Sequence, residues 1–277
     1  MQERIVDVEE LRRYYEVEGM STKQVGDIYG VTNKTIRAWL HKYGIPVRSM
    51  ATENRKYQVN DQYFKNIDTL NKAYILGFIC ADGYVGNNRR GNPATLGVAL
   101  SNGDRDVLQF IKHELGSEHP IKLDKTGQYC SISINSVELC NSLVALGIVP
   151  NKTLSLDIAE VIERAGLNEE QIPAFLLGYY DGDGCISNWV HPNGTTIQTL
   201  ISVVGTVETC QYIQQYFGKG FLKKRHNTDT NNITLQISGR LAATSCLDRL
   251  YKNPPSFFLK RKYDKYLLAK VPSSRQR

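Results

Sequence analysis

The residues of this sequence best suited to chemistry are two aspartates, each of which ends a similar apolar run. Residues 73–83 read AYILGFICADG and residues 174–184 read AFLLGYYDGDG, so Asp82 and Asp183 both precede a glycine. If each run is a helix, each carboxylate lies in its last turn, where an anion costs roughly 0.3–1 kcal/mol. A local rule that is broken twice in the same way indicates function. Two such carboxylates side by side repel each other, and a shared divalent cation would remove that repulsion.

Small residues at helical spacing predict that the two helices pack against each other. Gly77 and Ala81 are four residues apart, as are Gly178 and Gly182, so each pair shares one helix face. Side chains this small allow two helix backbones to approach closely. We expect each helix to end at the glycine that follows its aspartate. The alternative is a duplicated buried helix followed by an ordinary Asp-Gly turn.

The two runs resemble the LAGLIDADG signature of homing endonucleases. The matching residues are ILGFICADG (75–83) and LLGYYDGDG (176–184), and the resemblance continues over roughly residues 60–270. Two motifs in one chain resemble the pseudo-symmetric monomers of that family. The first acidic position of the motif is Cys80 in one copy and Asp181 in the other, whereas the second acidic position is kept in both. The resemblance implies an endonuclease that hydrolyses phosphodiester bonds in both strands of a DNA target.

The resemblance also implies a metal site between the two motifs. Asp82 and Asp183 would hold the cation, together with the backbone oxygens of Ala81 and Gly182. Mg²⁺ prefers a few carboxylates completed by water and substrate phosphate oxygens. We expect Mn²⁺ to replace Mg²⁺ and Ca²⁺ to bind without turnover. The metal would lower the pKa of an attacking water and stabilise the leaving oxygen.

Two lysines occupy matching places late in each copy, Lys152 in GIVPNKT and Lys262 in LKRKYDK. This pairing resembles the lysine position of the family, where a cation near the scissile phosphate offsets developing charge. The alternative is a pair of ordinary surface lysines, especially for Lys262, which two basic residues adjoin. Asn102 and Thr206, at the ends of predicted strands, are weaker candidates for ordering water in the site.

The composition sets the class of protein. At 277 residues the prior is about two domains, and the 41% hydrophobic content is ordinary for a globular protein. The N-terminus has no signal-peptide core, and no run is long enough to span a membrane, so we expect a cytoplasmic, DNA-associated protein. None of the six cysteines forms a CxxC pair, which predicts reduced thiols. The net charge of +6 points to a polyanionic partner.

Residues 1–48 predict a helix–turn–helix DNA-binding domain of three short helices. Ser21 is an N-cap candidate for the second helix, Gly30 makes the turn, and the third helix starts near Asn33. The third helix would read the major groove. Its candidate DNA contacts are Lys34, Thr35, Arg37, His41 and Arg48. The alternative is a small helical module for protein–protein contacts.

The rest of the chain divides into a duplicated body. We predict a linker over residues 49–70, a first half-domain over 71–153, a solvated acidic connector over 154–170 and a second half-domain over 171–277. Each half reads as helix, two strands, helix, two strands, helix. The predicted fold class is therefore α+β, with two pseudo-symmetric αββαββα half-domains that form a DNA-binding saddle.

The predicted strands alternate between apolar and polar residues, which gives each sheet one face for the core and one for DNA. A two-stranded ribbon fits the major groove. Basic residues on or beside the hairpins are the candidate DNA contacts, namely Arg89, Arg90, Lys122, Lys125, Lys223, Lys224 and Arg225.

The sequence favours a monomeric, site-specific homing endonuclease, encoded by an intron or a phage mobile element, whose partner is double-stranded DNA and not a membrane. One alternative is a transcription regulator on the same fold that does not cleave. A second alternative is an intron maturase that binds intron RNA.

Overall fold

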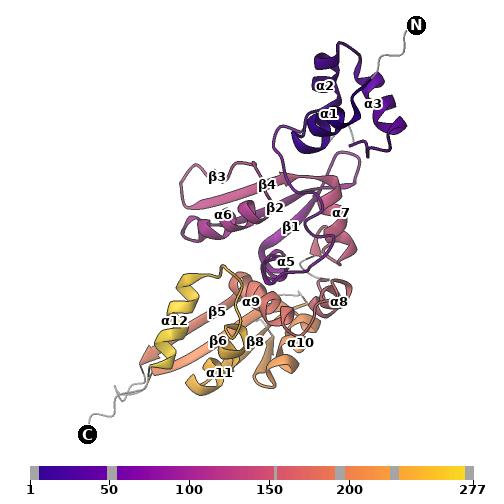
Figure 1. The fold of residues 1–277 in the computed structure, drawn as a ribbon. Coiled ribbons are helices and arrows are strands. Elements are labelled where there is room, and N and C mark those ends of the chain that lie inside the picture. Colours follow the sequence, from indigo (N-terminus) through magenta and orange to yellow (C-terminus); the bar gives the residue numbers. More distant parts are fainter. Residues whose placement is uncertain (1–5, 49–54, 153–154, 191–196, 225–230, 272–277) are drawn as a thin grey trace. The chain divides into compact units, whose positions relative to one another are not determined.

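A computed structural model describes residues 6–48, 55–152, 155–190, 197–224 and 231–271. The chain forms two compact units, Met1–Gln58 and Val59–Arg277 (Figure 1). The predicted linker over residues 49–70 is therefore too long. Its last part belongs to the second unit, because Tyr63 and Phe64 are buried in the core of that unit.

The first unit is helical, as predicted. Its elements are α1 (Val8–Arg12), a π-helical turn η1 (Arg13–Val17), α2 (Thr22–Tyr29) and α3 (Asn33–Lys42). Ser21 caps α2 in a capping box, and Thr32 caps α3. Gly30 adopts the left-handed conformation, with φ 65°, and makes the turn from α2 to α3. Buried apolar side chains from all four elements and the following loop form a separate small core.

The second unit contains the helix–strand order αββαββα twice. The first copy comprises α5 (Leu70–Asp82), β1 (Gly83–Asn87), β2 (Pro93–Ser101), η2 (Asn102–Asp104), α6 (Arg105–Glu114), β3 (Lys122–Leu123), β4 (Tyr129–Asn135) and α7 (Val137–Ala145). The second comprises α9 (Gln171–Asp183), β5 (Gly184–Val190), β6 (Ile197–Thr206), α10 (Val207–Phe217), β7 (Phe221–Lys224), β8 (Asn232–Ser238) and α11 (Arg240–Leu250). Two helices, α8 (Ile158–Arg164) and α12 (Lys260–Lys270), lie between and after the copies.

Each copy builds one antiparallel sheet, with strand orders β1-β2-β4-β3 and β5-β6-β8-β7. Leu96 and Val98 on β2 are buried, and they pair with the buried Ile134 and Ile132 on β4. The alternate side chains turn away from the helices, so each sheet has the apolar and polar faces that the sequence predicts. None of the helices in the described ranges is long and apolar enough to cross a membrane.

The predicted acidic connector is more than a solvated segment. α8 carries Ile158, Val161 and Ile162 into the core, while Glu160 and Glu163 remain outside it. The charges of this stretch predict a solvated segment, but the apolar residues between them form one face of a helix.

The two motif helices α5 and α9 lie side by side (Figure 1). They meet backbone to backbone at their glycines. A Cβ atom at Gly77 would lie 1.9 Å from the backbone oxygen of Phe175, and one at Gly178 would lie 2.0 Å from that of Tyr74. Both distances are far below any real Cβ contact, so only glycine allows this approach. The predicted interface of small residues is present, and Gly182 fits against Ala81 in the same way, at 2.4 Å.

Both motif helices end at the expected glycines, but these residues are extended rather than left-handed. Gly83 has φ −82° and Gly184 has φ −92°, so each helix runs directly into a strand. A Cβ at Gly83 would lie 2.8 Å from the Ile79 carbonyl oxygen, and one at Gly184 would lie 2.4 Å from that of Tyr180. Close approach, and not backbone conformation, therefore requires glycine at these two positions.

Replacing Gly77 with alanine should destabilise the second unit by about 1–3 kcal/mol or more, because the two helices must move apart to admit the methyl group. Gly103→Ala is the matched control, since the nearest atom to its added Cβ is 3.9 Å away. Chemical denaturation of both variants measures the difference. Equal stability of the two variants would mean that the helix contact is loose.

Candidate functional site

The two motif aspartates lie at the adjoining ends of α5 and α9. Each is the last residue of its helix, and each is half-buried. A Cβ placed on Gly182 would lie 3.2 Å from Oδ2 of Asp82, so the first carboxylate sits against the residue that precedes Asp183. The close helix contact therefore brings one carboxylate from each half-domain into the same site.

Both carboxylates have a raised pKa. Burial is the main cause for Asp82, and the nearby lysines partly offset it. Burial and then repulsion from Asp82 raise the pKa of Asp183 to about 6. Each group is thus held in a setting that disfavours its own negative charge, as the sequence predicts.

Lys152 neutralises the end of the first motif helix. Its side chain is 7% exposed, and its Nζ donates to the carbonyl oxygens of Cys80 at 2.6 Å and Ala81 at 3.2 Å. Asn151, with φ 61°, is the one non-glycine residue of the described ranges in the left-handed region, and it turns the chain immediately before Lys152. Burial lowers the pKa of Lys152, while Cys80, Asp183 and Asp82 favour its charged form.

Lys262 does the same for the second motif helix. It is 2% exposed, and its Nζ donates to the carbonyl oxygens of Tyr180, Asp181 and Gly184 at 2.6–2.7 Å. Burial lowers its pKa to about 8. Neither lysine is an ordinary surface residue, so the geometry favours the pairing that the sequence suggested over its alternative.

The first acidic position of the motif, which only the second copy keeps acidic, has a structural role there. Asp181 is 2% exposed and accepts hydrogen bonds from Tyr74 on α5 and from the backbone N–H of Leu259, both at 2.8 Å. It thereby ties the start of α12, which carries Lys262, to both motif helices. Cys80 occupies the equivalent place in the first copy and is a buried thiol whose pKa burial raises to about 12.

Arg261 forms a second tie across the two half-domains. Its guanidinium makes two 2.7 Å hydrogen bonds to the carboxylate of Asp104, which ends η2 in the first copy. A bidentate pair of this kind fixes orientation as well as distance. Together with Asp181, it fixes α12 beside the site.

The residues around the aspartates fit a hard divalent cation. The two carboxylates supply oxygen ligands, and their mutual repulsion favours a cation. Of the two predicted carbonyl ligands, the oxygen of Ala81 already accepts a hydrogen bond from Lys152 at 3.2 Å, and that of Gly182 stays a prediction. In the part of the chain that the structure describes, no group of three or more His, Cys, Asp or Glu could hold a metal. A cation here would therefore complete its shell with water or phosphate oxygens, which is the mode that Mg²⁺ prefers.

A cavity of about 210 Å³ opens beside Asp183 and Lys152. Thr206 and Asn232 contribute to its wall. The Thr206 hydroxyl already donates to Leu156 O at 2.6 Å and caps α10, so its predicted role in ordering water is not supported. The buried Oδ1 of Asn102 has no partner among the described residues, and Asn102 keeps that predicted role.

The candidate DNA contacts divide by position. Arg89, Arg90, Lys122, Lys125, Lys223 and Lys224 are exposed at or beside the hairpins, and Lys34 and His41 are exposed on α3, with Thr35 and Arg37 half-buried. Arg48 is a correction, because its guanidinium stacks on Tyr15, 4.2 Å from the ring centroid, and donates to backbone carbonyls, which makes it an internal anchor. Arg225 lies outside the described residues.

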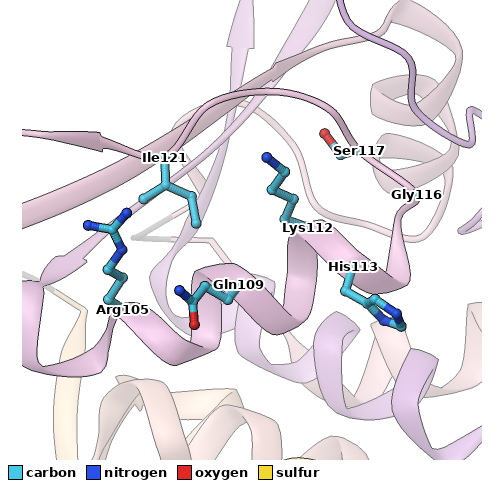
Figure 2. A pocket seen from close by; sticks show the side chains of 7 residues that line it. All are labelled: Arg105, Gln109, Lys112, His113, Gly116, Ser117 and Ile121. Atoms are coloured by element: carbon cyan, nitrogen blue, oxygen red, sulfur yellow. The ribbon is translucent and has the colours of Figure 1, made fainter.

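A separate surface cleft of about 530 Å³ runs along α6 (Figure 2). Arg105, Gln109 and Lys112 line it from one face of the helix, and Ile121 faces them from the loop before β3. The cleft has basic and amide groups but no carboxylate, and it does not include the motif aspartates. This cleft is therefore distinct from the site at the ends of α5 and α9.

Comparison with known proteins agrees with this geometry. Residues 69–144 match the family described as the LAGLIDADG-like domain. No curated protein matches the sequence.

Similar solved structures are LAGLIDADG enzymes bound to DNA. The homing endonuclease I-LtrWI bound to target DNA has a TM-score of 0.50 at 15% identity, covering 76% of this chain and 90% of that chain. The meganuclease I-SmaMI bound to uncleavable DNA has a TM-score of 0.51 at 15% identity, covering 72% and 90%. The meganuclease I-AabMI bound to uncleaved DNA has a TM-score of 0.50 at 16% identity, covering 71% and 89%. The first half-domain thus matches the LAGLIDADG-like domain over residues 69–144, and the second unit has the fold of these structures.

Sequence reasoning missed the residues that hold the site together. Asp181 was visible only as the first acidic position of the motif, and its partners Tyr74 and Leu259 are 107 and 78 residues away. The Arg261–Asp104 pair spans 157 residues. Asn151 carried a usable signal, since asparagine after proline is typical of a turn and tolerates the left-handed conformation.

Asp183→Asn should stabilise the metal-free protein at pH 8, by about 1–3 kcal/mol, because one pKa unit corresponds to about 1.4 kcal/mol and the variant has no charge to bury. The pKa of Asp183 is raised in the folded protein, so the folded state binds the proton more tightly than the unfolded chain. The wild type therefore gains stability as the pH falls from about 7 towards 4. Denaturation in EDTA should show the advantage of the variant shrinking by pH 5.

Asp124→Asn is the control, because the pKa of Asp124 is lowered in the folded protein whereas that of Asp183 is raised. Asp124 is exposed at the β3–β4 turn, and hydrogen bonds from Thr126 and Tyr129 lower its pKa. Its replacement should leave stability at pH 8 unchanged or reduced. A gain as large as that of Asp183→Asn would show that any loss of negative charge stabilises this basic protein.

Proposed function

We propose that this chain is a site-specific homing endonuclease that makes a Mg²⁺-dependent double-strand break in a long DNA target. The observation that carries the proposal is the meeting of two half-buried aspartates, one from each half-domain, at the ends of α5 and α9. Each helix end also receives a buried lysine, Lys152 or Lys262. Because one chain supplies both halves, it would act as a monomer.

The residues of the site have separable roles in this proposal. A bound Mg²⁺ supplies an activated water and stabilisation of the leaving oxygen. Asp82 and Asp183 would hold the cation and orient it towards the phosphodiester. Lys152 and Lys262 bring positive charge to the negative ends of the motif helices, which lowers the energy of an anionic phosphate beside them. The cavity next to Asp183 and Lys152 leaves room for water.

The polar faces of the two sheets would bind the duplex. The eight strands of the described structure contain no Asp or Glu, and Lys122 and Lys223 project from the polar faces. Such faces suit phosphates and base edges in the major groove. The DNA-bound structures of the same fold support this assignment.

The helical unit would act as a second DNA-binding module of the helix–turn–helix type, with α3 as the reading helix. Its N-terminal turn presents Lys34 and Thr35, and His41 lies two turns further on. α3 contains no acidic residue. A transcription regulator or an intron maturase would share these binding surfaces but would not need the paired aspartates.

Cleavage should depend on both aspartates. The wild type, incubated with Mg²⁺ and a plasmid library of randomised inserts, is expected to linearise a subset of plasmids. Asp82→Asn and Asp183→Asn should each abolish double-strand cleavage while keeping DNA binding within about tenfold, because the sheet faces are untouched. Gel analysis of the plasmids and a binding assay in Ca²⁺ measure the two properties.

Glu163→Gln should cut normally, since Glu163 is an exposed carboxylate on α8, which belongs neither to the motif helices nor to the sheets. Binding without cleavage by the wild type would favour the regulator, and binding confined to folded intron RNA would favour the maturase. Either result, or retained cutting by an aspartate variant, contradicts the proposed nuclease site.

The contribution of the helical unit can be measured through salt dependence. Replacing both Lys34 and Arg37 with alanine should weaken DNA binding and reduce the slope of log K against log salt by about 1.8, which is about 0.9 per lost phosphate contact. Lys23→Ala, on the exposed side of α2, is the matched control and should leave the slope unchanged. An unaltered slope in the double variant would remove α3 from the DNA interface.

A further inference from the structure

The exposed aromatic side chains of the described residues all lie on the polar faces of the two sheets. They are Tyr84 on β1, Tyr129 on β4, Trp189 on β5 and Phe221 on β7, and each is 46–59% exposed. Each points away from the core, because its cross-strand partners are polar or glycine residues of the outer face. The phenyl ring of Phe221 has no polar group to explain its exposure.

These rings are isolated, so they do not form a docking patch for a protein. Tyr84 faces Gly97 and Tyr129 faces Ser101, four residues apart along β2. The second sheet repeats this spacing along β6. Trp189 pairs with Gln198 of β6, and Phe221 pairs with Gln236, which in turn pairs with Ser202 of β6. Four residues of a strand span about 13 Å. The outer-face position between the two rows is Ala99 on β2 and Leu200 on β6, and Leu200 has serines on both neighbouring strands. Single apolar contacts within a polar interface are therefore the use that the spacing permits.

In the second sheet, both rings are paired with a glutamine. Trp189 lies directly opposite Gln198 on β6, and Phe221 lies directly opposite Gln236 on β8. Directly opposite side chains have Cβ atoms about 4.5–5.5 Å apart. No hydrogen bond joins either glutamine amide to another described side chain, so both amides are available to a ligand.

An A·T base pair displays in the major groove the two groups that such a pair recognises. Adenine offers N7 and N6 to a bidentate glutamine amide, and thymine offers its 5-methyl group to an apolar surface. The first sheet lacks this combination, because its rings face Gly97 and Ser101. The two half-domains therefore carry different reading chemistry on the same framework.

We propose that the second half-domain reads two A·T base pairs of its half-site, one through Trp189 with Gln198 and one through Phe221 with Gln236. This assignment rests on the proposed DNA-binding function and names the bases that it recognises. The aromatic ring contacts the thymine methyl group, and the glutamine amide pairs with adenine. The two positions are separate, since the rows lie about 13 Å apart along β6.

The test starts from the duplexes that the full-length protein enriches from a random DNA library in Ca²⁺. The enriched duplex is then made with uracil in place of each thymine in turn, and with 7-deazaadenine in place of each adenine. At the two read positions, uracil should weaken binding about fourfold, as expected for one buried methyl group. 7-Deazaadenine should weaken it about tenfold through loss of the N7 acceptor.

The variants assign each loss to a side chain. Phe221→Ser should bind the thymine and uracil duplexes equally at its position, and Gln236→Ala should lose the 7-deazaadenine effect at the same base pair. At the other position, Trp189→Ser should bind the thymine and uracil duplexes equally, and Gln198→Ala should lose the 7-deazaadenine effect. Leu241→Ser is the control, because Leu241 is an apolar residue on α11 that is even more exposed than the two rings, and this variant should respond to both substitutions as the wild type does.

Two results would overturn the inference while the proposed function survives. In one, duplexes are enriched but uracil has no effect on the wild type. In the other, the uracil effect persists unchanged in both ring variants, which would assign it to the DNA itself. Enrichment of no duplex, or enrichment only from a single-stranded RNA pool, would instead defeat the proposed function, and this assignment with it.

Discussion

The contact between the backbones of α5 and α9 is the constraint on which the rest of the second unit depends. Gly77 and Gly178 each face a carbonyl oxygen of the other helix at a distance that no side chain tolerates. This approach fixes the helix ends, and the helix ends fix the carboxylates. The sheets begin at the same helix ends, because Gly83 and Gly184, which follow the helices directly, are the first residues of β1 and β5. Site and binding surface are thus set by one packing contact.

The charges of the site oppose the stability of the fold. Two carboxylates at the negative ends of two helices are unfavourable, and the buried lysines on the helix carbonyls compensate only in part, since both carboxyl pKa values stay raised. A protein shaped by stability alone would not keep this arrangement. The compensation is also unequal, because Lys262 receives additional support from Asp181 and from the Arg261–Asp104 pair, whereas Lys152 depends on the turn at Asn151.

Patterns that repeat along the chain could be predicted from the sequence, and contacts between distant residues could not. The duplicated motif predicted both helices, the small-residue interface and the place of Asp82 and Asp183, because each depends on local spacing. Alternation of apolar residues likewise predicted the two sheets. The role of Asp181, the internal use of Arg48 and the docking of Tyr63 and Phe64 depend on partners far along the chain. For such contacts, residue type alone gives no direction.

The position of Lys262 in the chain has a consequence for synthesis. The ribosome makes Asp82, Lys152 and Asp183 long before it reaches α12, the last helix of the described residues. Until that helix emerges and docks, the carbonyls of Tyr180, Asp181 and Gly184 lack their ammonium partner. A nascent chain would therefore hold both acidic groups without a finished site. The proposed nuclease would therefore stay inactive until α12 has been translated and has docked.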